Sequence, residues 1–149
     1  MADVSQPFNG IPPGRIMALD LGEKRIGVAF SDEWRRLARS HSVLKRSSRQ
    51  ADFAKLGQIA AEQGVTLLLV GLPLHLDGSE GPFTVWARDY GADLSGRLKL
   101  PLVFWDESLS SRQAADSLQE RGWRTTRQRQ WLDAVAAAFI LQHYLDSLT

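Results

Sequence analysis

The chain has 149 residues, of which 44% are hydrophobic and 23% charged, as expected of one globular domain long enough to bury a core. No apolar run approaches the ~20 residues needed to cross a bilayer, so a membrane span is excluded. The chain has no cysteine, which excludes disulfides and thiolate metal sites and favours a cytoplasmic location.

The first predicted elements follow an N-terminal segment rich in proline and glycine. We expect a disordered tail over residues 1–14, without the pattern of a secretory signal, and one domain over 15–149. Two apolar runs, 16–19 and 26–30, surround a short polar turn and predict a β-hairpin. A third strand is expected near residues 42–44.

Helices and strands alternate in the rest of the chain. Helical spacing of apolar residues predicts helices over 48–64, 83–98, 111–121 and 127–148. Continuous apolar runs at 65–70 and 102–105 predict strands buried on both faces. The order predicts an α/β fold with a mixed five-stranded sheet, an opening antiparallel meander plus parallel strands, flanked by helices.

Three acidic residues are expected to converge. Asp20 closes the first predicted strand and Glu107 the last, and ligands of open α/β sheets bind beyond the carboxyl ends of strands. Asp133 lies in the final helix, on one stripe with Ala136, Ala137, Ile140 and Tyr144 that should pack on the sheet. Each acid alone has an ordinary structural explanation. Together they predict an all-oxygen site that suits Mg²⁺ or Mn²⁺, with two ions expected for phosphoryl chemistry.

The basic residues are clustered, although the formal net charge is only +1. Between Trp34 and Ala51 there are six basic residues and no acidic one, and a second cluster precedes the final apolar stretch. Such clusters are either solvated faces or phosphate contacts. We expect nucleic-acid contacts from Lys24, Arg25, Arg35, Arg36, Arg39, Arg127 and Arg129.

Four motifs carry a family resemblance. Residues 20–29 (DLGEKRIGVA) resemble the opening motif of the YqgF (RuvX) family, which groups Holliday junction resolvases also assigned to 5′-end processing of pre-16S rRNA. Residues 70–74 with 77–81, 106–111 (DESLSS) and the helix from Asp133 to Leu145 resemble its other motifs. The resemblance implies a ribonuclease H-like fold, divalent metal, a structured nucleic-acid substrate and a catalytic triad at Asp20, Glu107 and Asp133. Ser108 departs from the family pattern, which has arginine there.

Two other functions are alternatives to a nuclease. An actin-like sugar kinase or ATPase also opens with Asp-Leu-Gly, but it needs two such domains and 149 residues leave no room. A non-catalytic nucleic-acid-binding module of the same fold is the stronger alternative, and the presence of all three acids favours catalysis over it. Branched DNA and precursor rRNA stay open as substrates. A junction-cutting enzyme is expected to be a symmetric homodimer, because two strands are cut at related positions.

Overall fold

The computed structural model describes residues 13–106 and 126–148, and in the second stretch it describes side chains from Gln130 onward. A five-stranded sheet forms the centre of the fold. The strands are β1 (Arg15–Leu21), β2 (Arg25–Ser31), β3 (Ala38–Lys45), β4 (Val65–Leu72) and β5 (Leu102–Asp106), in the spatial order β3-β2-β1-β4-β5. Strands β1 to β3 form an antiparallel meander, and β4 and β5 run parallel to β1. The predicted mixed sheet is therefore confirmed.

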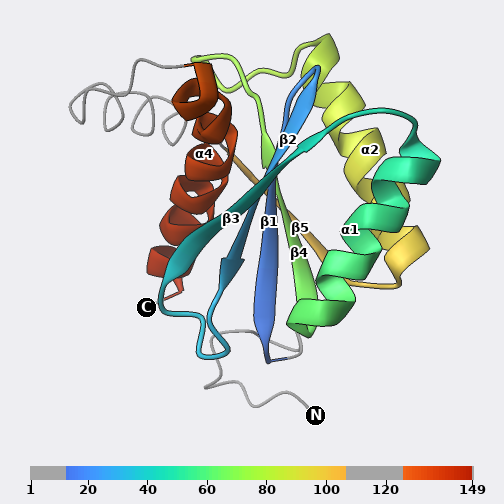
Figure 1. Cartoon of the computed structure of the whole chain (residues 1–149). Helices are drawn as coiled ribbons and strands as arrows, with labels where there is room; N and C mark the ends of the chain where they lie inside the picture. Colours follow the sequence, from blue (N-terminus) through green and yellow to red (C-terminus); the bar gives the residue numbers. More distant parts are fainter. Residues whose placement is uncertain (1–12, 107–125, 149) are drawn as a thin grey trace.

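The helices of the described residues cover both faces of this sheet (Figure 1). Helices α1 (Arg49–Gln63) and α2 (Pro82–Leu98) pack on one face, and α4 (Thr126–Ser147) packs on the other. Local signals set the ends of α1: the Ser48 side chain accepts a hydrogen bond from the Ala51 N–H at 3.1 Å, and Gly64 ends the helix in the left-handed conformation, at φ 65°. None of the described helices combines the length and apolar character needed to cross a bilayer.

The third strand is longer than the sequence predicts. Strand β3 begins at Ala38, four residues before the predicted start at 42. Its first half alternates small and polar residues at the sheet edge, so it carries little hydrophobic signal. The predicted helix over 111–121 and most of the predicted tail lie outside the described residues.

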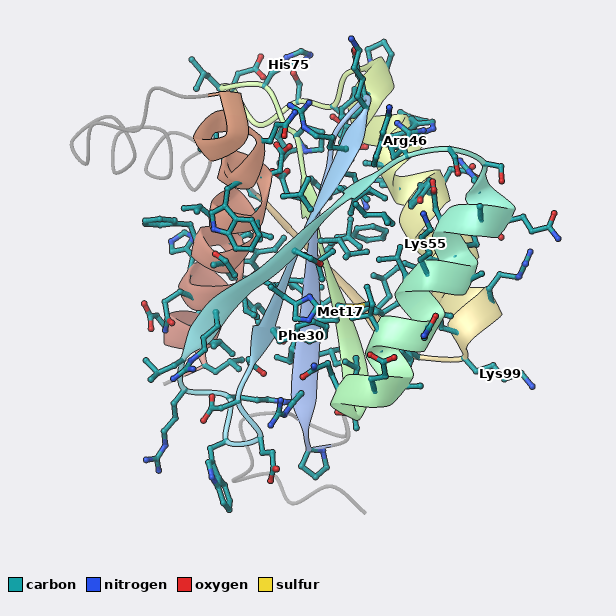
Figure 2. The ribbon with its side chains drawn as sticks, in the orientation of Figure 1. Met17, Phe30, Arg46, Lys55, His75 and Lys99 are labelled. Carbon is teal, nitrogen blue, oxygen red and sulfur yellow. The ribbon has the colours of Figure 1, made fainter. Side chains whose placement is uncertain are left out.

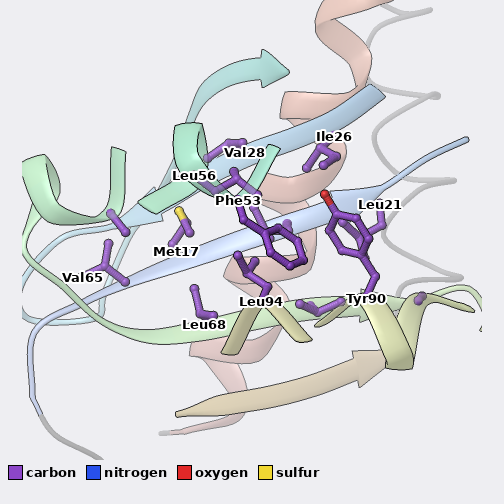
Figure 3. Close-up of a cluster of buried hydrophobic side chains, with 14 of the residues drawn as sticks. Met17, Leu21, Ile26, Val28, Phe53, Leu56, Val65, Leu68, Tyr90 and Leu94 are labelled. Atoms are coloured by element: carbon purple, nitrogen blue, oxygen red, sulfur yellow. The ribbon is translucent and has the colours of Figure 1, made fainter. Parts of the chain in front are cut away.

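The face under α1 and α2 carries the larger side chains. Met17, Leu19, Leu68 and Leu94 are fully buried there, and the Phe53 and Tyr90 rings meet edge to face with centroids 5.1 Å apart (Figure 3). Burial of each large apolar side chain contributes about 1.5–3 kcal/mol, so this cluster supplies much of the driving force for folding.

The face under α4 is built from smaller side chains. Ala18 and Ala29 of the sheet meet Ala137 and Ile140 of the helix in a second buried cluster. A Cβ atom at Gly27 would overlap the backbone carbonyl of Asp133, so β2 and α4 touch backbone to backbone at that point. This close approach positions the α4 residues nearest the sheet edge.

Candidate functional site

The register of the hairpin places Asp20 beside Asp133. Asp20 of β1 lies directly opposite Gly27 of β2, and directly opposite residues of an antiparallel pair point to the same face. Ala18, two residues earlier in β1, packs in the cluster under α4, so Asp20 is also on the α4 face. Because the backbone of Asp133 in α4 lies against Gly27, both predicted acids are neighbours of Gly27 on this face of the sheet.

Asp133 has a cationic partner from the same hairpin. The Arg25 Nε–H donates to Asp133 Oδ2 at 2.9 Å, and the two side chains are 42% and 26% exposed. The pair is therefore open to solvent on one side. Its carboxylate remains accessible to a ligand, and the guanidinium offsets part of its negative charge.

The third predicted acid, Glu107, lies outside the described residues, directly after the last residue of β5. Strands β1, β4 and β5 are parallel, so their carboxyl ends meet at one edge of the sheet. Asp106 ends β5 at this edge, opposite Leu72 of β4. Over residues 13–106 and 126–148, no three histidine, aspartate or glutamate side chains form a group able to hold a metal ion. Asp20 and Asp133 are the two predicted acids that the structure describes, and Glu23 lines the same cavity as Asp133.

The loop between β4 and α2 also lies at this edge and is internally hydrogen-bonded. Asp77 Oδ1 accepts from the Ser79 N–H at 2.9 Å and from its hydroxyl at 2.6 Å, and these bonds lower the pKa of the Asp77 carboxyl. Gly78 turns the chain at φ 86°, where a side chain would be strained. The Thr84 hydroxyl donates to the Pro73 carbonyl at 2.6 Å and joins the loop to α2. The 77–81 motif thus forms a defined turn beside the site.

Two adjoining cavities open at the end of the hairpin, one of them beside Asp133. One of about 280 Å³ is lined by Gly22, Glu23, Lys24, Arg25 and Asp133. The other, of about 430 Å³, is lined by Lys24, Arg25, Val43, Lys45 and Gln130. The two share Lys24 and Arg25, so these two predicted nucleic-acid contacts lie beside Asp133.

Arg35 does not belong to this surface, which corrects the expectation that it contacts a nucleic acid. It is 4% exposed, in the β2–β3 loop at the opposite end of the sheet. Its Nε–H donates to the Gly14 carbonyl at 2.7 Å, and its guanidinium also donates to Thr66 Oγ1 at 3.1 Å. The guanidinium therefore ties the start of β1 to β4 and the β2–β3 loop.

Arg36 and Arg39 are exposed, but they also lie at that opposite end. Arg39 pairs with Phe30, whose side chain packs in the cluster under α1 and α2, so Arg39 is on the other face of the sheet from Asp20. The side chains of Arg127 and Arg129 lie outside the described part of α4. Of the predicted basic contacts, Lys24 and Arg25 are the ones that the described side chains place at the site.

Lys45 is a site residue that the sequence prediction did not select, although it lies in the first basic run. It pairs with Arg25 across β2 and β3 and shares its face. The signal that could have found it is the register of the meander, because Gly27 pairs with Val43 and places Lys45 two residues further along the same face.

The sequence is similar to that of a known protein family. The family model described as "RuvX: Holliday junction resolvase" matches residues 14–147. A protein of Syntrophomonas wolfei named "Putative pre-16S rRNA nuclease" is 42% identical over 132 residues, which are 89% of this chain and 94% of that protein. A protein of the same name from Myxococcus xanthus is 43% identical over 133 residues, 89% of this chain and 88% of that protein.

Solved structures of low sequence identity share the fold. RuvC of Thermus thermophilus, in complex with a Holliday junction substrate, aligns with a TM-score of 0.56 at 18% identity, covering 90% of this chain and 94% of that one. A Fowlpox virus resolvase in complex with Holliday junction DNA aligns with a TM-score of 0.54 at 14% identity, covering 90% and 98%. The predicted ribonuclease H-like fold is confirmed by these neighbours.

Proposed function

The chain belongs to the RuvX family, and from this premise we propose that it is a metal-dependent endonuclease that hydrolyses phosphodiester bonds in structured nucleic acid. The observation that carries the proposal is the convergence of Asp20 and Asp133. They are 113 residues apart in sequence, and both lie next to Gly27: Asp20 pairs with it across the hairpin, and the Asp133 backbone carbonyl lies against it. Two carboxylates on one face of a sheet edge repel each other unless a cation lies between or beside them.

The residues present fit a divalent metal site. Asp20 and Asp133 offer carboxylate oxygens, the ligands that Mg²⁺ and Mn²⁺ prefer. We propose that Glu107, the next residue in sequence after the end of β5, completes the set, and that the three acids hold two ions. When bound, these ions would stabilise the negative charge that develops on the phosphate during displacement.

The chain's own basic residues would orient the substrate. Lys24 and Arg25 line the cavity that contains Asp133, so they can donate to phosphate oxygens next to the acids. These contacts go to the backbone and not to the bases. The enzyme would therefore recognise the shape of a nucleic acid rather than its sequence.

The experiment that tests the function offers the purified chain two substrates side by side. A synthetic four-way DNA junction and a precursor 16S rRNA are incubated with Mg²⁺ or Mn²⁺, and cleavage is followed by gel. We expect cleavage of at least one substrate, and the faster reaction assigns the physiological class. Gel filtration of the junction complex tests the proposed homodimer.

The acid variants separate catalysis from binding alone. Asp20→Asn, Glu107→Gln and Asp133→Asn should each lower cleavage by more than about 100-fold, because even second-shell changes at metal sites cause losses of 10–100-fold. Nucleic-acid binding should be kept. The matched control is Asp89→Asn on α2, whose side chain is 72% exposed and pairs with Arg49. A wild-type chain that binds both substrates and cleaves neither would favour the non-catalytic module instead.

A further inference from the structure

Strand β3 divides the first basic run between two ends of the molecule. Arg35, Arg36 and Arg39 lie at its start and Lys45 at its end, and an eight-residue strand spans roughly 25 Å. The next two basic residues are also engaged elsewhere. Arg46 donates to the Gly22 and Glu23 carbonyls, and Arg49 pairs with Asp89 and Asp93. Lys45 is therefore the member of this run that faces the groove beside the acids.

The groove has a defined wall on each side. Arg25 of β2 and Val43 and Lys45 of β3 share the α4 face, because Arg25 pairs with Lys45 and Gly27 pairs with Val43. Gln130 forms the opposite wall from α4, one turn before Asp133. Lys24 lies at the rim, where its backbone carbonyl accepts from the Arg46 N–H at 2.9 Å.

The cavity with Lys45 is separate from the cavity with Asp133. Lys45 lines the larger cavity and Asp133 the smaller, while Lys24 and Arg25 line both. Asp20 of β1 and Lys45 of β3 are two strands apart, and Lys45 is displaced by two residues along its strand. Their Cα atoms are therefore on the order of 12 Å apart. A phosphate held at Lys45 thus lies beside the one at the acids.

We propose that Lys24 and Lys45 form a second phosphate subsite, which binds a neighbouring phosphodiester of the cleaved strand. The strand then runs from the acid pair, past Arg25, along the groove between α4 and the end of β3. Two ammonium groups without a carboxylate among the residues lining the larger cavity suit the anionic backbone of any sequence. This proposal rests on the proposed nuclease function and assigns the side on which its substrate lies.

The subsite is tested by the salt dependence of binding. Binding of a fluorescein-labelled four-way DNA junction is titrated in EDTA, so that no cleavage occurs, for wild type, Lys45→Gln and Lys24→Gln. Each lost phosphate contact should lower the slope of log K against log salt by about 0.9, and affinity at 0.1 M salt should fall roughly five- to tenfold. Lys45→Arg should restore the wild-type slope.

Two control variants each remove one positive charge from a surface away from the groove. Lys55 is exposed on α1, on the other side of the sheet (Figure 2), and Arg36 is exposed at the far end of β3. Lys55→Gln and Arg36→Gln should bind like wild type. Calorimetric Mn²⁺ affinity and the melting temperature should be unchanged in Lys45→Gln, since the side chain is exposed and is not among the acids.

The possible results separate the subsite from the function. If wild type binds with a steep salt dependence and cleaves, but Lys45→Gln has the same slope and affinity, the subsite is wrong and the nuclease stands. Equal losses in Lys55→Gln would also overturn the subsite, because charge alone and not position would then matter. If wild type neither binds nor cleaves any nucleic acid, the proposed function itself fails.

Discussion

The two faces of the sheet are built on different principles. Under α1 and α2, large side chains such as Phe53, Leu56 and Tyr90 fill the space between layers. Under α4, Gly27 and several alanines let the helix backbone reach the sheet. Both candidate acids that the structure describes are on the α4 face. The difference indicates that one face mainly supplies stability and the other fixes the position of a helix that carries a functional carboxylate.

The largest effect is expected when one methyl group is added to a glycine on each face. In Gly27→Ala the new Cβ would overlap the Asp133 carbonyl, and backbone on both sides leaves little room to relax. We expect a loss of about 3 kcal/mol or more in the free energy of unfolding. Cleavage should be lost as well, because Asp133 must move away from Asp20. Urea unfolding and the cleavage assay measure the two effects.

The matched variant on the other face is Gly91→Ala in α2. Its Cβ would lie 3.0 Å from Phe104 Cε1, an aromatic side chain that can shift, and alanine is a better helix former than glycine by about 1 kcal/mol. Stability should change by less than about 1 kcal/mol, with cleavage intact. Equal behaviour of the two alanine variants would show that the α4 contact has no special role.

The second prediction concerns a buried hydrogen bond on the α1–α2 face. The Tyr90 hydroxyl donates to Asp52 Oδ2 at 3.1 Å, and Asp52 is 1% exposed. Tyr90→Phe removes one donor from this buried carboxylate, which still accepts from the Ser47 N–H at 3.0 Å. We expect a loss of about 1–2 kcal/mol in the free energy of unfolding, with unchanged kcat. A fall in kcat at full stability would contradict the division between the faces.

The same tyrosine gives the protein a pH dependence. Burial and the neighbouring Asp52 carboxylate raise the Tyr90 pKa above its ordinary value of 10. Above pH 10 the unfolded chain releases this proton while the folded protein keeps it, so stability is complete below pH 10 and falls as the pH rises beyond it. Burial also raises the pKa of Tyr144, a residue of α4. Unfolding measured from pH 8 to 11 should show a shallower alkaline decline for Tyr90→Phe than for wild type.

The fold was predictable because its signals are local. Apolar runs at 65–70 and 102–105 matched β4 and β5, and Ser48 and Gly64 marked the ends of α1. That Asp20 and Asp133 lie on the same side of the sheet was predictable too, since both lie on strongly patterned elements and the stripe of small residues on α4 required close packing. Glu107 stays a prediction, because it lies outside the described residues.

The basic surface was less predictable, because charge says nothing about which end or face a residue occupies. Arg35 is buried through bonds to Gly14 and Thr66, which are distant in sequence and carry no signal of the contact. Arg39 is on the face away from the acids because the β2–β3 pairing shifts register between Val28 and Ala29. The run of positive residues therefore extends along β3, and its first and last members lie at opposite ends of the sheet.

The smallest effect on stability is expected from removing the Arg25–Asp133 ion pair on the α4 face. Like Tyr90→Phe, this change removes one polar contact, but on the opposite face of the sheet. Arg25→Gln removes a partly exposed ion pair with Asp133, and such pairs contribute at most about 1 kcal/mol, so the melting temperature should barely change. Two functional readouts should move in opposite directions. Mn²⁺ affinity should rise on the order of threefold, because a cation next to the acids is gone, and junction affinity should fall, because a phosphate partner is lost.

Arg25→Lys keeps the charge and should retain both affinities more closely, while Arg36→Gln at the far end of the sheet should change neither. Calorimetry with Mn²⁺ measures the first affinity and junction titration in EDTA the second. Weaker Mn²⁺ binding in Arg25→Gln would mean that the 2.9 Å bond to Asp133 Oδ2 mainly orients the carboxylate for the metal. In that case Arg25 would be a positioning residue for Asp133 rather than a competitor of the ion, and the α4 face would depend on side-chain as well as backbone contacts to set its geometry.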